Sequence, residues 1–282
     1  MHRTLVSTDL LASHLDGDWI IVDCRYDLQN EQWGRDQYQS AHVPGALYAS
    51  LLEDLAGPRT GSNGRHPLPS IESLTATFGR FGISRDRQVI VYDQDSGAWA
   101  SRLWWSLRYL GHDAVAVLDG GWAKWAREGR LVTSGDERRS PAIFKATPRP
   151  EMRASVDEVS SAAQSSLLLV DARAPERFEG RTEPIDRAAG HIPGAVNHFF
   201  KSNVADDGTM LPAGQLRDTF TQLLQGRDVS QAVMYCGSGV TACHNLLALE
   251  HAGLAGARLY PGSWSEWSSD PTRPIEKGPS ST

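Results

Sequence analysis

One cysteine stands where the sequence could place a nucleophile. The apolar run Ala232–Tyr235 ends at Cys236, the segment Gly-Ser-Gly-Val-Thr follows, and a helical pattern begins at about Ala242. Glycines let the backbone curl with its N–H groups turned inward, and the start of a helix adds partial positive charge. Both effects favour the thiolate form of Cys236, which is the nucleophilic form.

The alternative is that Cys236 is a small buried hydrophobe, which is the usual state of a free cysteine. We favour the reactive interpretation because the apolar run stops at Cys236 and a glycine loop starts there. That interpretation requires a thiol that is not shut away beneath packed side chains. The other two cysteines, Cys24 and Cys243, are expected to be packing residues, since three sparse cysteines do not make a disulfide framework.

The overall composition bounds the class of protein. A length of 282 residues is comfortable for two domains, and a formal net charge of −6 argues against nucleic acid as the main partner. The first residues lack the apolar core of a signal peptide, and no run approaches the ~18 apolar residues of a membrane span. Metal ligands at zinc-finger spacing are absent from the sequence. We therefore expect a cytoplasmic protein with no cofactor, no metal, no nucleic-acid partner and no membrane partner.

The two halves of the chain repeat each other. Four blocks recur in the same order, namely Ile21–Arg25 with Leu169–Arg173, Ala41–Ala46 with Gly190–Ala195, Val89–Asp93 with Ala232–Cys236, and Gly121–Trp125 with Ser263–Trp267. Such self-similarity indicates a duplicated domain. We expect an N-terminal domain over 1–135, a proline-containing linker over 136–150, a C-terminal domain over 151–272 and a tail over 273–282, frayed from Glu276 onward.

Each copy alternates apolar strands with helical segments. Helices are expected over 7–15, 71–81 and 99–110 in the first copy and over 155–164, 216–224 and 241–252 in the second, and the last strands over 114–118 and 257–260. Alternation of this kind predicts an α/β fold in which each copy is a parallel sheet with helices on both faces. Ligands bind such sheets at the carboxyl ends of the strands. Asp171, Cys236 and the Gly262 loop should lie at that edge.

The duplication supplies an internal control. The first copy carries Asp93 where the second carries Cys236. A carboxylate cannot act as a thiol nucleophile, so we expect the second copy to be catalytic and the first to be a scaffold.

With these blocks in place, the chain resembles the two-domain rhodanese family of sulfurtransferases. The resemblance covers essentially the whole length, from Val22-Asp23 to the block Ser263–Trp267. The loop Cys236–Thr241 is similar to the version found in mercaptopyruvate sulfurtransferases. Thiosulfate-preferring rhodaneses typically carry arginine and lysine where this chain has Gly237 and Ser238.

The resemblance implies a sulfurtransferase that works in two steps. The Cys236 thiolate takes the sulfane sulfur of 3-mercaptopyruvate and becomes a persulfide, and a thiol, cyanide or a thioredoxin-like protein then accepts the sulfur. Backbone N–H groups of the loop would stabilise the persulfide anion. The loop residues in this role are Gly237, Ser238, Gly239, Val240 and Thr241.

The resemblance also implies other site residues. Arg177 and Arg187 correspond to the pair that binds the substrate carboxylate, which suits the forked hydrogen bonds that arginine makes. His66 would act with Ser238 as an imidazole–hydroxyl relay for protons. In the family an acidic residue upstream orients this histidine; the matching position here is Leu52, with Glu53 and Asp54 beside it, and Asp54 is the candidate for that role.

Three alternatives compete with this interpretation, and the sequence argues against the second of them. A thiosulfate:cyanide sulfurtransferase is the nearest, although a loop without cationic side chains suits a compact dianion less well. A cysteine phosphatase needs a Cys-x5-Arg loop, and Ala242 occupies the position of that arginine. A non-enzymatic persulfide carrier or sensor fits a duplicated domain with one inactive copy, but the second copy keeps the whole nucleophilic loop.

Overall fold

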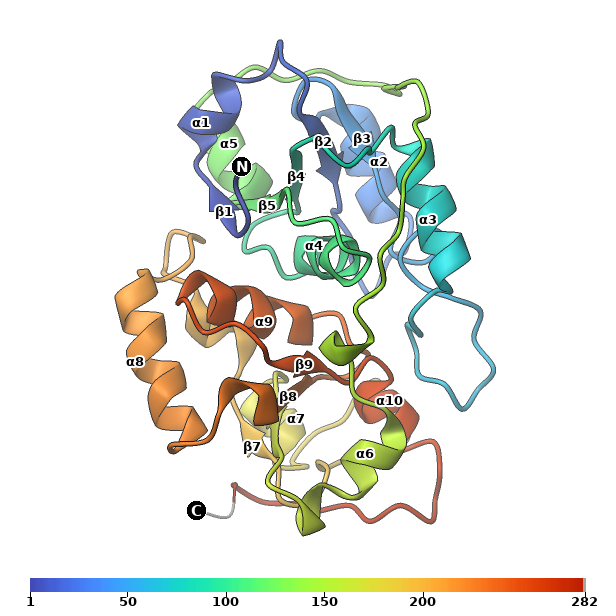
Figure 1. Cartoon of the computed structure of the whole chain (residues 1–282), viewed down its shortest axis with the longest axis vertical. Coiled ribbons are helices and arrows are strands. Elements are labelled where there is room, and N and C mark those ends of the chain that lie inside the picture. Colours follow the sequence, from blue (N-terminus) through green and yellow to red (C-terminus); the bar gives the residue numbers. More distant parts are fainter. Residues whose placement is uncertain (281–282) are drawn as a thin grey trace. The chain divides into compact units, whose positions relative to one another are not determined.

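The computed structural model describes residues 1–280 and divides the chain into two compact units (Figure 1). Unit 1 consists of Met1–Gly57, Pro69–Arg149 and Val204–Met210, and unit 2 of Pro58–Leu68, Pro150–Asn203 and the residues from Leu211 onward. The segment Pro58–Leu68, which carries His66, is thus part of the same unit as Cys236.

Unit 1 is built on a parallel five-stranded sheet of order β1-β5-β4-β2-β3. Its strands are β1 (Leu5–Val6), β2 (Ile20–Asp23), β3 (Ala46–Tyr48), β4 (Val89–Tyr92) and β5 (Val115–Leu118). The central strands β5, β4 and β2 are completely buried and apolar except for Asp23, which ends β2, as expected for a sheet covered on both faces.

The helices of unit 1 flank this sheet. They are α1 (Thr8–Ala12), α2 (Trp33–Ser40), α3 (Ile71–Arg80), α4 (Ala100–Tyr109) and α5 (Gly121–Arg127). Leu11 of α1 and Trp125 of α5 share one core cluster with Ile21 and Ile90 of the sheet, while α4 packs against β4 and β5.

Unit 2 repeats the plan with a parallel sheet of order β7-β6-β8-β9. Its strands are β6 (Leu168–Asp171), β7 (Val196–Asn197), β8 (Ala232–Tyr235) and β9 (Arg258–Leu259). Its α-helices are α6 (Val156–Ser160), α7 (Pro175–Phe178), α8 (Ala213–Leu224), α9 (Ala242–His251) and α10 (Ser263–Trp267), and its 3-10 helices are η1 (Pro150–Met152), η2 (Ala162–Gln164), η3 (Phe200–Asn203) and η4 (Val229–Gln231).

The carboxyl ends of the strands of unit 2 carry the predicted chemistry. Asp171 ends β6 and pairs with Tyr235, which ends β8, so Cys236 follows at the same edge. The Gly262 loop follows β9 and leads into α10. Both predictions, the parallel α/β class and the clustering of these segments at one edge, are confirmed.

Several helices are shorter than the sequence pattern predicts. The segment 155–164 is not one helix, because α6 ends at Ser160 and η2 follows. The hydroxyls of Ser160 and Ser161 donate to carbonyls of α6, a side-chain bond that competes with continued helix. Likewise α1 ends at Ala12, where the Ser13 hydroxyl donates to the Leu10 carbonyl.

The expected tail is not frayed over its described part. Glu276 forms an antiparallel bridge with His191, and the Gly278 N–H donates to the Glu179 carbonyl at 2.9 Å. The Asn197 N–H donates to the Ser280 hydroxyl at 3.2 Å, and residues 281–282 lie outside the described chain. The local composition predicts a frayed tail, but these long-range hydrogen bonds hold residues 276–280 in place.

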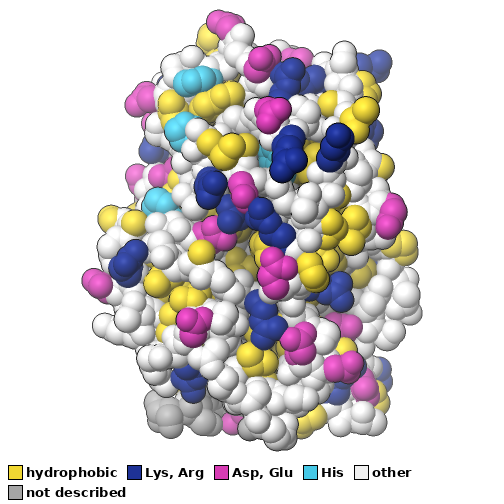
Figure 2. Space-filling view, viewed as in Figure 1, with side chains coloured by type: hydrophobic (Ala, Val, Ile, Leu, Met, Phe, Trp, Pro, Cys, Tyr) yellow, Lys and Arg dark blue, Asp and Glu magenta, His cyan; other side chains and the backbone are white. Residues whose placement is uncertain are grey.

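Surface charge is mixed. On the face shown in Figure 2, Lys and Arg side chains are interspersed with Asp and Glu. Over residues 1–280, no helix is long and apolar enough to cross a membrane.

Candidate active site

The loop after β8 brings a backbone N–H group to the sulfur of Cys236. The Gly239 N–H donates to the Cys236 Sγ at 3.2 Å. Gly239 has φ +74°, and a Cβ there would lie 2.3 Å from the Pro261 carbonyl oxygen. Positive φ and this close approach of backbone both require glycine. The residue identity therefore fixes the geometry that brings an N–H group to the sulfur.

The segment that leads into α10 holds this loop in place. The Ser263 hydroxyl accepts the Cys236 N–H at 3.1 Å, and the Trp264 N–H donates to the Cys236 carbonyl at 2.9 Å. The Ser265 N–H donates to the Gly237 carbonyl at 2.9 Å. Ser263 itself has φ +55°, a strained conformation for a residue with a side chain. The repeated Gly/Ser-Trp block is thus a support of the cysteine loop.

All three cysteines are buried and free, and Cys236 is only 2 % exposed, so the expectation of a solvent-accessible thiol is wrong. The reactive interpretation rests instead on the N–H group that contacts its sulfur. What distinguishes the three is the surroundings of each sulfur. The Sγ of Cys236 accepts an N–H, whereas the Sγ of Cys243 donates to the Gly239 carbonyl at 3.4 Å. Burial and nearby carboxylates raise the pKa of Cys24 well above its ordinary value. Of the three environments, the one at Cys236 suits a sulfur anion.

Ser238 and His66 lie in direct contact. The His66 Nδ1 and the Ser238 Oγ are 2.8 Å apart, and both side chains are buried. His66 reaches the loop on the segment Pro58–Leu68, where the Arg65 N–H is held by the Ser265 hydroxyl at 2.9 Å. The geometry allows a proton to pass between hydroxyl and imidazole.

Asp54, considered from the sequence as the residue that orients His66, has other partners. Its carboxylate accepts the Ser50 N–H at 2.8 Å and forms an ion pair with Arg80.

A run of alternating charges extends from β6 to the cysteine loop. We call it the ion-pair network, and its members in order of contact are Asp171, Arg173, Glu183, Arg177, Asp186 and Arg65. Arg173 pairs with Asp171 at 2.7 Å and with Glu183 at 3.2 Å. Arg177 joins Glu183 at 2.7 Å to Asp186 at 3.0 Å. Arg65 closes the network through its ion pair with Asp186.

The end of this network lies against the residue next to the nucleophile. A Cβ on Gly237 would be 2.9 Å from Arg65 Nη2, 3.5 Å from Asp186 Oδ2 and 3.6 Å from Arg177 Nη1. The lack of a side chain at Gly237 therefore makes room for two guanidinium groups beside Cys236. Among residues 1–280, the buried Nε of Arg65 has no hydrogen-bond partner, so a donor faces no acceptor there.

The pKa values of the two acidic members nearest the loop, Asp186 and Glu183, are shifted in opposite directions. Burial raises the pKa of Asp186, against the opposing effect of Arg65. Burial acts on Glu183 too, but hydrogen bonds from Arg177 and from the Asp186 N–H outweigh it and lower the pKa of Glu183. Of the two, Asp186 is therefore the carboxylate that is more easily protonated.

The two arginines expected from the sequence differ in their contacts. Arg177 lies beside Gly237 but is tied to Glu183 and Asp186. Arg187 is exposed, and within the described part of the chain it makes no hydrogen bond or ion pair.

Arg65, Glu183 and Asp186 are site residues that sequence reasoning missed. A signal existed for each. Arg65 directly precedes His66, and the two acidic residues fall between Arg177 and Arg187 in a stretch of alternating charge. The spacing of residues in a sequence does not show which side chains of distant segments meet. The ion pairs between these residues could therefore not be predicted.

The equivalent loop of unit 1 is filled by its own carboxylate. Asp93 accepts backbone N–H groups from Asp95 at 3.2 Å, Gly97 at 2.9 Å, Trp99 at 2.7 Å and Ala100 at 3.0 Å. Burial raises the pKa of Asp93 to about 6, although these bonds oppose it. Both copies of the loop therefore direct backbone N–H at an acidic side chain, one group at Cys236 and four at Asp93.

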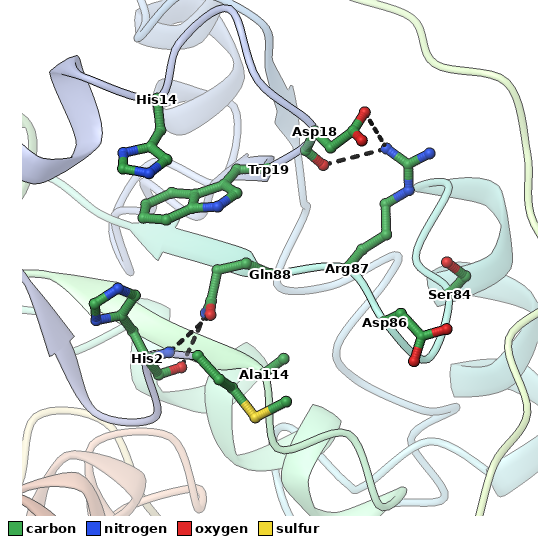
Figure 3. A pocket seen from close by; sticks show the side chains of 10 residues that line it. His2, His14, Asp18, Trp19, Ser84, Asp86, Arg87, Gln88 and Ala114 are labelled. Atoms are coloured by element: carbon green, nitrogen blue, oxygen red, sulfur yellow. Dashed lines mark hydrogen bonds and ion pairs between the residues drawn. The ribbon is translucent and has the colours of Figure 1, made fainter.

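Unit 1 also contains a pocket of about 580 Å³ away from this loop (Figure 3). His14 stacks on Trp19 with ring centroids 4.0 Å apart, and Arg87 pairs with Asp18 at 3.0 Å. The residues that line it include neither a cysteine nor any site residue expected from the sequence. Over residues 1–280, no group of three His, Cys, Asp or Glu residues could hold a metal ion.

Comparison with known proteins agrees with this architecture. The family description "Rhodanese-like domain" matches residues 7–128 and 155–270. A Pseudomonas aeruginosa protein named "Probable 3-mercaptopyruvate sulfurtransferase" is 45% identical, with 98% of each chain covered. A Mycobacterium tuberculosis protein named as a putative thiosulfate sulfurtransferase is 42% identical, also with 98% of each chain covered. The solved structure of a 3-mercaptopyruvate sulfotransferase from Escherichia coli superposes with a TM-score of 0.78 at 31% identity, covering 94% of this chain and 100% of that one.

Fold and loop together define a tandem α/β protein with a cysteine at the end of a central strand in one copy. The chain belongs to the rhodanese family of sulfurtransferases, as the resemblance implied.

Proposed function

We propose that the protein transfers a sulfane sulfur from 3-mercaptopyruvate to a thiol or cyanide acceptor through a persulfide on Cys236. The observation that carries this proposal is the Gly239 N–H directed at the Cys236 Sγ at the carboxyl edge of the sheet. The relative named as a probable 3-mercaptopyruvate sulfurtransferase, at 45% identity, supports the choice of donor.

The first step forms one bond and breaks one. The Cys236 thiolate attacks the sulfur of 3-mercaptopyruvate, an S–S bond forms, and the C–S bond breaks with its electron pair on carbon. The enolate of pyruvate leaves and takes up a proton at carbon, while the thiol proton of the donor is lost from the new persulfide. Cys236 then carries an anionic terminal sulfur, which the loop N–H groups stabilise.

The second step returns the enzyme to its starting state. An acceptor thiolate or cyanide attacks the outer sulfur, the S–S bond breaks, and the electron pair remains on Cys236. The acceptor leaves as a persulfide or as thiocyanate. This double displacement requires no external oxidant or reductant.

Ser238 and His66 are proposed to move the proton of the first step. Their contact of 2.8 Å suits a relay in which the hydroxyl donates toward the leaving carbanion and the imidazole restores the hydroxyl proton. Arg177 and Arg187 are proposed to bind the carboxylate and the ketone of the donor, because arginine makes forked bonds to such oxygens.

A second candidate function is transfer from thiosulfate, which the 42% identical putative thiosulfate sulfurtransferase favours. Steady-state rates of the wild-type protein with both donors, with cyanide as acceptor, decide between them. The proposal expects a higher kcat/KM for 3-mercaptopyruvate. A higher kcat/KM for thiosulfate would overturn the assignment of the donor, and no turnover with either donor would overturn the assignment of the reaction.

A further inference from the structure

Arg65 occupies the space that a side chain at position 237 would fill. A Cβ on Gly237 would lie 2.9 Å from Arg65 Nη2, so a side chain at that position would have to displace the guanidinium. Arg65 comes from the separate segment Pro58–Leu68 of the same unit. The loop itself has no cationic side chain, yet a cation lies directly beside it.

Asp186 neutralises that cation. It forms ion pairs with Arg65 and with Arg177, and its side chain is only 4% exposed. Because charges alternate along the ion-pair network, its three acidic and three basic members sum to zero. Removal of the Asp186 charge would leave one net positive charge at the end that touches Gly237.

We infer that the Arg65–Asp186 pair sets the selectivity of the enzyme for the charge of its sulfur donor. This inference rests on the proposed function and concerns the choice between donors. Thiosulfate is a dianion, and the carboxylate of 3-mercaptopyruvate carries one charge. When Arg65 is paired with Asp186, it attracts a dianion little more than a monoanion. Without that partner, its positive charge attracts the dianion more strongly than the monoanion.

The test replaces Asp186 by its neutral isostere. Asp186→Asn should raise the ratio of kcat/KM for thiosulfate to kcat/KM for 3-mercaptopyruvate by about tenfold, the effect expected of one unit charge a few Å away in a partly solvated site. Most of the change should lie in KM for thiosulfate, because a charge that acts on the ground state and the transition state alike changes binding.

Arg65→Gln should move the same ratio in the opposite direction, since it leaves Asp186 without one of its two cationic partners. The double variant Arg65→Gln/Asp186→Asn restores the balance of charge and should bring the ratio back toward the wild-type value. Glu179→Gln is the matched control, because Glu179 lies on the same stretch and pairs with the exposed Arg181 at 2.6 Å. It should leave the ratio unchanged.

The outcomes separate the two proposals. An active wild-type protein whose donor ratio does not change in Asp186→Asn or in Arg65→Gln overturns the selectivity role and leaves the sulfurtransferase function intact. If Asp186→Asn does not fold, the ratio measured for Arg65→Gln decides alone. A wild-type protein that turns over neither donor overturns the proposed function and the selectivity role with it.

Discussion

The exposed guanidinium of Arg187 has no partner among the described residues, whereas that of Arg177 is bound to two carboxylates. An arginine without partners is available to bind a ligand at no cost in broken ion pairs. Arg177 must exchange a carboxylate of the protein for one of the donor. The two arginines therefore differ in how they could contribute to binding.

Arg187→Ala should raise KM for 3-mercaptopyruvate by about tenfold and KM for thiosulfate by less, because the variant removes a contact to a carboxylate. The free energy of unfolding should stay within about 0.5 kcal/mol of the wild-type value, as for other exposed positions. Steady-state kinetics with both donors and a urea titration provide the measurements. Equal increases in KM for both donors would show that Arg187 does not contact the carboxylate.

The cysteine loop depends on two elements, β8 before it and the segment Gly262–Trp267 beside it. In the loop, Gly239 lies very close to the backbone just before that segment, because a Cβ there would lie 2.3 Å from the Pro261 carbonyl oxygen. The neighbour is backbone and cannot rotate away. The N–H that contacts the sulfur belongs to the same residue.

Gly239→Ala should therefore lower kcat by at least about tenfold, since a displaced Gly239 N–H no longer stabilises charge on the sulfur. Strain at positive φ and the backbone contact should also lower the free energy of unfolding by about 1–3 kcal/mol. Rates with 3-mercaptopyruvate and thermal unfolding are the two measurements.

Gly226→Ala is the matched control for this variant. Gly226 has a similar φ of +80°, but a Cβ there would meet no atom within 4 Å. It should lose stability without a change in kcat. A similar loss of kcat in both variants would mean that strain alone, and not the position of the Gly239 N–H, explains the effect.

Across the whole molecule, duplication yields two loops with different acidic groups. Unit 2 presents the sulfur of Cys236 to an N–H group, and unit 1 presents the carboxylate of Asp93 to four N–H groups. The Asp93 carboxylate accepts the N–H groups of its own loop. Unit 1 thus retains the loop without the nucleophile.

Asp93 should make the stability of the fold depend on pH. Burial raises its pKa from 3.8 to about 6, so the folded state binds the proton more tightly than the unfolded state. The stabilisation by protonated Asp93 is complete below about pH 4 and is lost as pH rises through about 6, by about 3 kcal/mol in total. Asp93→Asn cannot titrate and should lack this component.

Urea unfolding of both proteins between about pH 4 and pH 7 measures the effect. The free energy of unfolding of the wild type minus that of Asp93→Asn should fall across this range and then level off. A difference that stays constant, or rises with pH, would show that Asp93 is not protonated more readily in the folded state.

The sequence was sufficient to predict the duplicated parallel sheets and the position of Cys236 at a strand end, because apolar runs, glycines and the repeated blocks are local signals. It was not sufficient for Arg65 or Asp186, whose partners lie far away in sequence and meet only in the folded unit. The end of α6 and the ordered residues 276–280 were missed for a related reason. Hydrogen bonds from individual hydroxyl groups end α6, and long-range backbone hydrogen bonds order residues 276–280. Neither composition nor hydrophobic periodicity predicts such bonds.

The most direct test of the central claim is mass spectrometry of the wild-type protein after incubation with 3-mercaptopyruvate, followed by addition of a thiol or cyanide. Peptide mapping should locate one added sulfur atom on Cys236, and the acceptor should remove it at a rate no slower than turnover. The variant Cys236→Ser should gain no sulfur and show no transfer. An adduct on Cys24 or Cys243 instead, or an adduct on Cys236 that acceptors do not discharge, would contradict the account.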